Sequence, residues 1–291
     1  MPKDDSTATL EQILRQEVAA FCCHENVIWK QMAVKTIREL KAVEWPAVFF
    51  GGTLRSLLIS RLWKKKPGRP RDIDIVIQGT PVEQLKEQFE EFISRETRFG
   101  GLQLRRGNWQ FDVWPLNKTW AFGQDCVDRP EFADLPKTTF FNLEAIAVDV
   151  WPEPGRPRRI FSGDGQFFEG IVNRVLEVNR EDNPFPGLCV VRALIFAGSL
   201  DFFLGPRLAR YIVFEGEKMS SADLEEIQMS HYGRIRERGD ELKSWIQSIA
   251  KQHERDDSVR VSLPLMRQLT LWPCEELDSP RIHFRSLCGA K

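Results

Sequence analysis

The chain has 291 residues, of which 42% are hydrophobic and 29% charged, a composition that fits a folded protein of about two small domains and excludes long disorder. Its 41 basic residues nearly balance its 42 acidic residues, and the net charge of −1 excludes a globally basic nucleic-acid coat, so contact with phosphate must come from local patches. No apolar run approaches the roughly 20 residues of a membrane span, and the polar start MPKDDSTATLEQ does not fit a signal peptide, so we expect a cytoplasmic protein with no membrane partner.

The predicted secondary structure has a mixed α and β part followed by a helical part. Helices are assigned where apolar residues recur at intervals of three and four, and strands where residues alternate or β-branched residues cluster. The first part is predicted to contain helix 9–42, capped by Ser6 or Thr7 and broken near 22–26, strand 47–50, helix 53–61, strand 72–77, helix 81–95, a hairpin of 102–106 and 109–113, and strands 145–150 and 159–161. The second part is predicted to contain helices 186–200, 207–214, 222–229 and 239–253. The boundary falls near 160–165, and the expected fold class is α+β.

A glycine pair, Gly51-Gly52, ends the first predicted strand and opens the helix that carries Arg55. Glycine lets backbone N–H groups approach an anion closely, and a helix N-terminus favours negative charge. We therefore expect Gly51, Gly52 and Arg55 to contact phosphate, with a surface ion pair as the alternative for Arg55. The basic loop 64–71, KKKPGRPR, runs directly into the next strand and ends on Arg71. It fits either a grip on a triphosphate or acceptor backbone, or a solvated loop.

Two aspartates, Asp72 and Asp74, stand at the start of the second predicted strand, and Asp112 lies in a later strand. Because residues two apart in a strand point to the same face, Asp72 and Asp74 project together. Facing carboxylates repel unless a cation lies between them, which suits a divalent metal, with Asp112 as a third ligand. Three carboxylates holding two Mg²⁺ ions about 4 Å apart is an arrangement used for in-line phosphoryl or nucleotidyl transfer. The alternative is an exposed edge strand that carries both aspartates for solubility.

Other side chains near the third aspartate allow two interpretations. Trp109, Trp114 and Trp120 could stack on a base, or they could pack in the core. Of the adjacent Arg105 and Arg106, one is expected to face the cleft and the other to face away. The four histidines fall in no motif, and no role is assigned to them.

The segments GGTLRSLLISR and RDIDIVI resemble the Gly-Gly-x-x-Arg and Asp-x-Asp signature of polymerase-β-type nucleotidyltransferases. The likeness is greatest to the class II CCA-adding enzyme and bacterial poly(A) polymerase family. Further resemblance to that family follows in the same order, in FNLEAIAVDV, IFSGDGQFFEGIVNRVLEVN and LCVVRALIFAGSLDFFLG. It covers about residues 47–205. The resemblance implies a catalytic head, a small mixed β-sheet flanked by helices, over 43–162, preceded by a helical segment over 1–42 and followed by an all-α neck and body over 163–291.

The sequence also departs from the family pattern. Ser56 stands where the family has Asp, and Glu144 where it has Asn, while the Arg-Arg-Asp that precedes this segment is missing. The family reads the incoming base with a Glu-Asp-x-x-Arg motif on the neck helix that carries Arg192 here. Counted back from Arg192, its places hold Phe185, Pro186 and Cys189. The metal-binding half of the site is thus expected to be intact and the base-reading half replaced, which favours an active enzyme with an altered nucleotide or acceptor preference.

The resemblance implies transfer of NMP or dNMP from a nucleoside triphosphate to a hydroxyl, with Mg²⁺ or Mn²⁺ as cofactor. The implied metal ligands are Asp72, Asp74 and Asp112. The implied nucleotide-binding residues are Gly51, Gly52, Arg55, Arg71 and Arg192. The expected acceptor is a nucleic-acid 3′ end. Two other acceptors remain open, a free nucleotide and a protein hydroxyl, as does a non-catalytic RNA-binding module that retains the fold.

Overall fold

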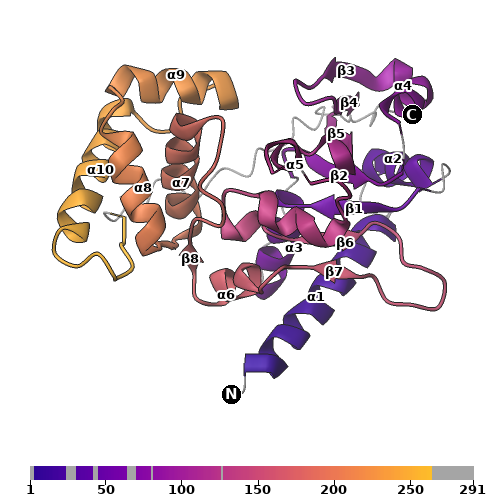
Figure 1. Ribbon diagram of the computed structural model, residues 1–291, viewed down its shortest axis with the longest axis horizontal. Coiled ribbons are helices and arrows are strands. Elements are labelled where there is room, and N and C mark those ends of the chain that lie inside the picture. The colour runs from indigo at the N-terminus through magenta and orange to yellow at the C-terminus, as the bar shows by residue number, and fades with distance from the viewer. Residues whose placement is uncertain are drawn as a thin grey trace, which may run out of the picture.

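The computed structural model describes residues 3–23, 31–41, 45–63, 70–79, 81–125 and 127–263. In Figure 1 a β-sheet with its helices lies at the right and a group of helices from the last third of the chain lies at the left. The expected α+β class is confirmed by this arrangement. No helix of the described residues is long and apolar enough to cross a membrane.

Within the described residues, the main sheet has seven strands in the order β3-β4-β5-β2-β1-β6-β7. Its strands are β1 Ala47–Phe50, β2 Ile73–Ile77, β3 Ile93–Glu96, β4 Leu102–Arg106, β5 Trp109–Pro115, β6 Ala147–Asp149 and β7 Ile160–Phe161. β2 and β5 pair in parallel, and the other neighbours pair antiparallel, so the sheet is mixed as expected. β2 lies between β5 and β1, which rules out the alternative that its aspartates sit on an exposed edge strand.

Strand alternation gives the two faces of the sheet different characters. Phe49, Ile75 and Phe111 point to one face and are buried in the main core. Helices that contribute to this core are α1 Lys3–Cys23, α2 Gln31–Lys41, α3 Gly52–Leu62 and α4 Val82–Phe89. Asp74 and Asp112 point to the opposite face, where α5 (Trp120–Gln124) and a 3₁₀ segment, Phe132–Thr138, cover a smaller apolar cluster. The carboxylates therefore lie beside an apolar patch rather than within it.

The helical part packs onto the same core. Its elements are α6 Gln166–Val172, β8 Val175–Leu176, α7 Pro186–Leu200, β9 Phe203–Leu204, α8 Pro206–Gly216, α9 Ser221–Tyr232 and α10 Gly239–His253. Proline at the first turn starts α7 and α8, and Ser220 caps α9 by accepting a 3.2 Å bond from the Asp223 N–H. Gly233 ends α9 with φ +69°, a conformation glycine adopts at low cost. Because one core runs from the sheet into these helices, the division at 162/163 stays a prediction.

Several elements differ from the sequence prediction. α1 begins at Lys3, so neither Ser6 nor Thr7 caps it, and the expected break lies partly in 24–30, outside the described residues. The helix predicted over 81–95 ends at Phe89, and a 3₁₀ turn leads into β3, because Ile93 onward gains a partner in β4. β8 and β9 are only two residues long, too short to leave an alternating pattern. Most of the basic loop, 64–69, also lies outside the described residues.

Candidate active site

The glycine turn between β1 and α3 forms one wall of the site. Gly51 has φ +67°, in the left-handed region that favours glycine, and its N–H donates to the Ile146 carbonyl at 3.0 Å. No side chain caps the N-terminus of α3, and Gly51, Gly52, Thr53 and Arg55 line a cavity of about 740 Å³. Free backbone N–H groups at the start of a helix favour an anion at this position.

Three aspartates line the same cavity. Asp74 and Asp112 are direct partners on the parallel strands β2 and β5, and Asp72 precedes β2. Burial, together with the charges of Asp72 and Asp112, raises the pKa of Asp74 well above its usual value. Burial also raises the pKa of Asp112, although a 3.0 Å hydrogen bond from Gln103 Nε2 opposes the rise. The cavity thus concentrates negative charge that a cation would relieve.

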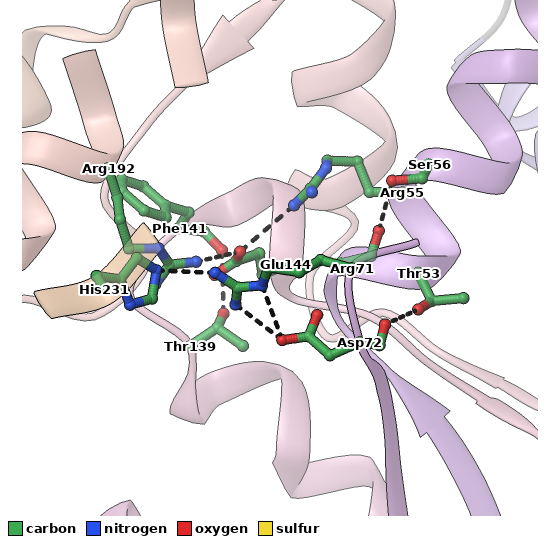
Figure 2. A network of polar contacts seen from close by, with 11 residues as sticks. Thr53, Arg55, Ser56, Arg71, Asp72, Thr139, Phe141, Glu144, Arg192 and His231 are labelled. Carbon is green, nitrogen blue, oxygen red and sulfur yellow. Dashed lines mark hydrogen bonds and ion pairs between the residues drawn. The ribbon is translucent and has the colours of Figure 1, made fainter. Parts of the chain in front are cut away.

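Arg71 connects the aspartates to the helical part. Its Nε and Nη2 donate to Asp72 Oδ2 at 3.1 and 2.8 Å, and its Nη1 lies 3.1 Å from Nε2 of His231 on α9 (Figure 2). Burial, reinforced by the charges of Arg71 and Arg192, lowers the pKa of His231 to about 4, so the imidazole is neutral at pH 7 and accepts a hydrogen bond from Arg71. Thr53 Oγ1 fixes the backbone by donating to the Asp72 carbonyl at 3.0 Å.

Glu144 joins the two halves of the site, as Figure 2 shows. It ends the short 3₁₀ segment Asn142–Glu144, and its Oε1 accepts from Arg192 Nη2 at 2.5 Å and lies 3.4 Å from Arg55 Nη1. Burial lowers the pKa of Arg55 to about 10, despite the attraction of Glu144. Burial is the largest effect on Arg192 and lowers its pKa, but Glu144, Tyr232 and Cys189 together outweigh burial, so the pKa of Arg192 is raised. The two guanidinium groups, from α3 and α7, therefore share one carboxylate.

All eight residues predicted for the site are brought together around this cavity: Gly51, Gly52, Arg55, Arg71, Asp72, Asp74, Asp112 and Arg192. Arg192 forms an ion pair with Glu144 and also lies in the cavity wall.

Two of the three tryptophans and neither of the paired arginines lie near the site. Trp109 is buried in the core, whereas Trp114 and Trp120 line a second cavity of about 340 Å³. The expectation that Arg105 or Arg106 faces the cleft is wrong. Arg105 is exposed, and Arg106 is buried under α2, where it pairs with Glu39 and contacts Thr36, because α2 packs on β4 at that position.

The cavity lining also includes Glu144, His231, Tyr232 and Arg236, to which the sequence assigns no role in the site. In the sequence Glu144 is only a departure from the family pattern, and its charge is the one feature that points to a role in the site. His231, Tyr232 and Arg236 come from α9 and the turn after it, and no local pattern marks them.

The donor set suits a hard divalent cation, because three carboxylates supply oxygen ligands on one face of the sheet. Among the residues that the structure describes, no three acidic, histidine or cysteine side chains are grouped closely enough to hold a metal as they stand. Asp72 is engaged by Arg71, and Asp112 by Gln103. The chemistry of the site therefore fits a divalent cation once Arg71 transfers to another anion.

A mixed sheet with a glycine turn before a helix and facing aspartates on neighbouring strands is the arrangement that the nucleotidyltransferase resemblance implies. Comparison with known proteins confirms that resemblance. The chain is 25% identical over 206 residues to the CCA-adding enzyme of Lactobacillus johnsonii, a match that spans 67% of this chain and 48% of that enzyme. This chain thus spans about half the length of the curated relative it matches. No model of a known protein family matches it.

Solved structures with similar folds come from tRNA-processing proteins. The CCA-adding enzyme of Thermotoga maritima complexed with tRNA has a TM-score of 0.49 and 16% identity, over 77% of this chain and 50% of that one. A tRNA nucleotidyltransferase complexed with a primer tRNA and an incoming ATP analogue has a TM-score of 0.49 and 17% identity, over 75% and 59%. A tRNA-processing enzyme in an apo form has a TM-score of 0.49 and 18% identity, over 87% and 59%.

Proposed function

We propose that this protein is a nucleotidyltransferase that transfers a nucleoside monophosphate from a nucleoside triphosphate to a hydroxyl acceptor and releases pyrophosphate. The observation that carries the proposal is one cavity whose lining includes the glycine turn at Gly51, four arginines, and the carboxylates of Asp72, Asp74 and Asp112. The sequence similarity to a CCA-adding enzyme supports the same reaction class.

The basic residues of the cavity would bind the triphosphate, and the acidic residues would bind the metal. In this proposal the triphosphate is held by the start of α3 with Arg55, and by Arg71 and Arg192. All of them line the cavity, and guanidinium groups and helix N-termini bind phosphate oxygens. Mg²⁺ or Mn²⁺ bound by Asp72, Asp74 and Asp112 would supply charge stabilisation at the α-phosphate and a lower pKa for the attacking hydroxyl. In the reaction, the acceptor oxygen bonds to the α-phosphorus, the bond to the β-phosphate oxygen breaks with its electron pair leaving on pyrophosphate, and the hydroxyl proton passes to water.

We propose a nucleic-acid 3′ end as the acceptor, because the curated relative is a CCA-adding enzyme. A free nucleotide or a protein hydroxyl would give different products. Incubation with Mg²⁺ or Mn²⁺ and each labelled NTP and dNTP, with and without total RNA, followed by separation by size, distinguishes them. Lengthened RNA supports the proposal, and short oligomers or labelled protein would replace its acceptor. RNA binding without consumption of any triphosphate would identify a non-catalytic RNA-binding module.

Aspartate variants test the catalytic assignment. Asp72→Ala and Asp74→Ala are each expected to abolish transfer while leaving the protein folded, because both side chains line the cavity rather than the core. Asp257→Ala is the matched control, since Asp257 is exposed and its nearest arginine, Arg210, lies 3.8 Å away at the surface. Undiminished product from either cavity variant would refute the assignment.

A further inference from the structure

A second cavity opens beside the carboxylates and shares part of its lining with the first, including Phe50, Glu144 and Arg192. Asp74 and Asp112 line both cavities, whereas Asp72, Gly51 and Arg55 line only the first. Leu102 of β4 and Val113 of β5 line only the second cavity, because both strands lie on the opposite side of β2 from β1. The second cavity measures about 340 Å³, within the range of roughly 300–1,000 Å³ that is usual for small-molecule sites.

The geometry of the proposed reaction indicates which reactant would enter the second cavity. In an in-line displacement, the attacking oxygen and the leaving oxygen lie on opposite sides of the phosphorus. If the triphosphate lies against the start of α3 and Arg71, pyrophosphate departs on that side. The acceptor hydroxyl then approaches across Asp74 and Asp112, from the second cavity.

The second cavity is rich in aromatic side chains, and Lys118 and Arg192 are the basic residues that line it within the described part of the chain, Arg192 being shared with the first cavity. Phe99 is 40% exposed, and Trp114 and Trp120 are partly exposed, so all three present ring surface. Trp114 is held in place, since its Nε1 donates to Thr119 Oγ1 at 3.0 Å. A Cβ on Gly101 would lie 2.8 Å from the Trp114 Cβ, so a glycine at this position leaves room for the indole.

Polar groups at the edge of this cavity complement the aromatic rings. Lys118 offers a cation for one phosphate, and Asn183 offers an amide that can both donate and accept hydrogen bonds. Aromatic rings with a few polar groups and one or two cations suit a nucleobase and its phosphate, because every base has a face that stacks on a ring.

We propose that the second cavity binds the terminal nucleoside of the acceptor, stacked on Phe99, Trp114 or Trp120, with its hydroxyl directed at Asp112. This inference rests on the proposed function and deepens it, since it makes the acceptor a nucleoside with a free hydroxyl rather than a protein side chain. Two sources supply that chemistry, the 3′ end of an RNA strand and a free nucleotide.

Crosslinking tests the site without requiring turnover. The probes are a 12-residue RNA with 4-thiouridine as its last nucleoside, the same RNA with 4-thiouridine five residues from the end, and free 4-thiouridine monophosphate. After irradiation of the full chain, mass spectrometry maps the attached peptide. We expect the terminal probe to attach to peptides containing Phe99, Trp114 or Trp120, and the internal probe to attach elsewhere. Equal labelling of these peptides by both RNAs, or labelling only outside them, would overturn the proposal.

Kinetics of two variants provide the second arm. Phe99→Ala and Trp120→Ala are each expected to raise the acceptor KM about tenfold, from the loss of one stacked ring, with the triphosphate KM unchanged. Phe214→Ala is the control, because Phe214 is 64% exposed on α8 and lines neither cavity. Trp120→Phe is expected to restore most of the loss, which separates stacking from a folding defect.

The outcomes separate this inference from the proposed function. Transfer to RNA with an acceptor KM unchanged in both ring variants refutes the acceptor site and leaves the nucleotidyltransferase proposal standing. Absence of transfer to any acceptor refutes the proposed function, while the crosslinking pattern still reports whether the cavity binds a nucleoside. Crosslinking and extension of the free nucleotide alone would assign the cavity to that source instead of RNA.

Discussion

Replacement of Glu144 by glutamine removes the charge that Arg55 and Arg192 share. Glutamine keeps nearly the same shape and one accepting oxygen, so the change is mainly electrostatic. It leaves two guanidinium groups facing each other across the junction of α3 and α7 without their common counter-ion. We expect Glu144→Gln to destabilise the free protein and, at the same time, to strengthen its binding of polyphosphate.

The magnitude follows from the exposure of the three side chains. Removing one partner of a fully buried ion pair costs about 3–5 kcal/mol, and removing one from an exposed pair costs at most about 1 kcal/mol. The side chains of Glu144 and Arg55 are each 15% exposed, and that of Arg192 is 26% exposed, which places this cluster nearer the buried limit. Because glutamine still accepts one hydrogen bond, the expected loss is about 2 kcal/mol, or roughly 4–8 °C in Tm.

Thermal unfolding with and without pyrophosphate measures both effects. The variant is expected to melt below the wild type in buffer and to gain more from added pyrophosphate, because the anion replaces the missing carboxylate. Glu153→Gln is the control, since Glu153 pairs with Arg156 at an exposed site and its loss should change stability by about 0.5 kcal/mol or less. Equal stability of Glu144→Gln and the wild type, or equal gains from pyrophosphate, would refute the reasoning.

Three further predictions concern neighbouring groups. The raised pKa of Asp74 means that the folded state binds the Asp74 proton more tightly than the unfolded state does. The stability contributed by this proton is fully present below the unfolded pKa of about 4 and is lost as pH rises through the folded pKa. In EDTA, Asp74→Asn should therefore have a higher Tm than the wild type at pH 8 and a smaller fall in Tm from pH 4 to 8; parallel curves would contradict this. His231→Ala, which removes the partner that orients Arg71 Nη1 and leaves the bonds of Arg71 to Asp72, should raise the triphosphate KM about three- to tenfold with little change in kcat. An unchanged KM would exclude a positioning role. Asn142→Ala leaves the Glu177 N–H and the Val175 carbonyl without their side-chain partner. The free energy of unfolding, measured in urea, should fall by about 2–4 kcal/mol. A fall below about 0.5 kcal/mol, which is typical of a surface change, would show that those groups find other partners.

The parts of the site that the sequence predicts are those fixed by local geometry. A glycine pair after a buried strand indicates a turn in which the backbone can approach a ligand. Strand alternation places Asp72 and Asp74 on one face, independently of the tertiary structure. The hairpin that contains Asp112 is equally local. Its pairing in register with Asp74 depends on β5 joining β2 in parallel, a contact between distant segments that strand alternation alone does not fix.

The remaining parts depend on contacts between distant segments. His231 meets Arg71 across 160 positions, and Glu144 meets Arg192 across 48, so neither partner leaves a periodic signal. The same limit explains Arg106, whose place under α2 depends on how that helix packs against β4. Local propensity also failed at 93–95, where pairing with β4 outweighs the helical pattern.

The charged residues that line the first cavity balance one another, as they nearly do over the whole chain. Among the described residues that line this cavity, four arginines face four carboxylates: Arg55, Arg71, Arg192 and Arg236, with Asp72, Asp74, Asp112 and Glu144. Partly buried guanidinium groups need counter-ions, and these carboxylates supply them when no phosphate is bound. In the proposed function, a triphosphate would exchange partners with this cluster, with Arg71 moving from Asp72 and Arg55 and Arg192 moving from Glu144 towards phosphate oxygens. The same exchange frees Asp72 for a cation. Nucleotide and metal are therefore expected to bind cooperatively, because a nucleotide on Arg71 releases Asp72 for the metal, and a metal on Asp72 releases Arg71 for the nucleotide.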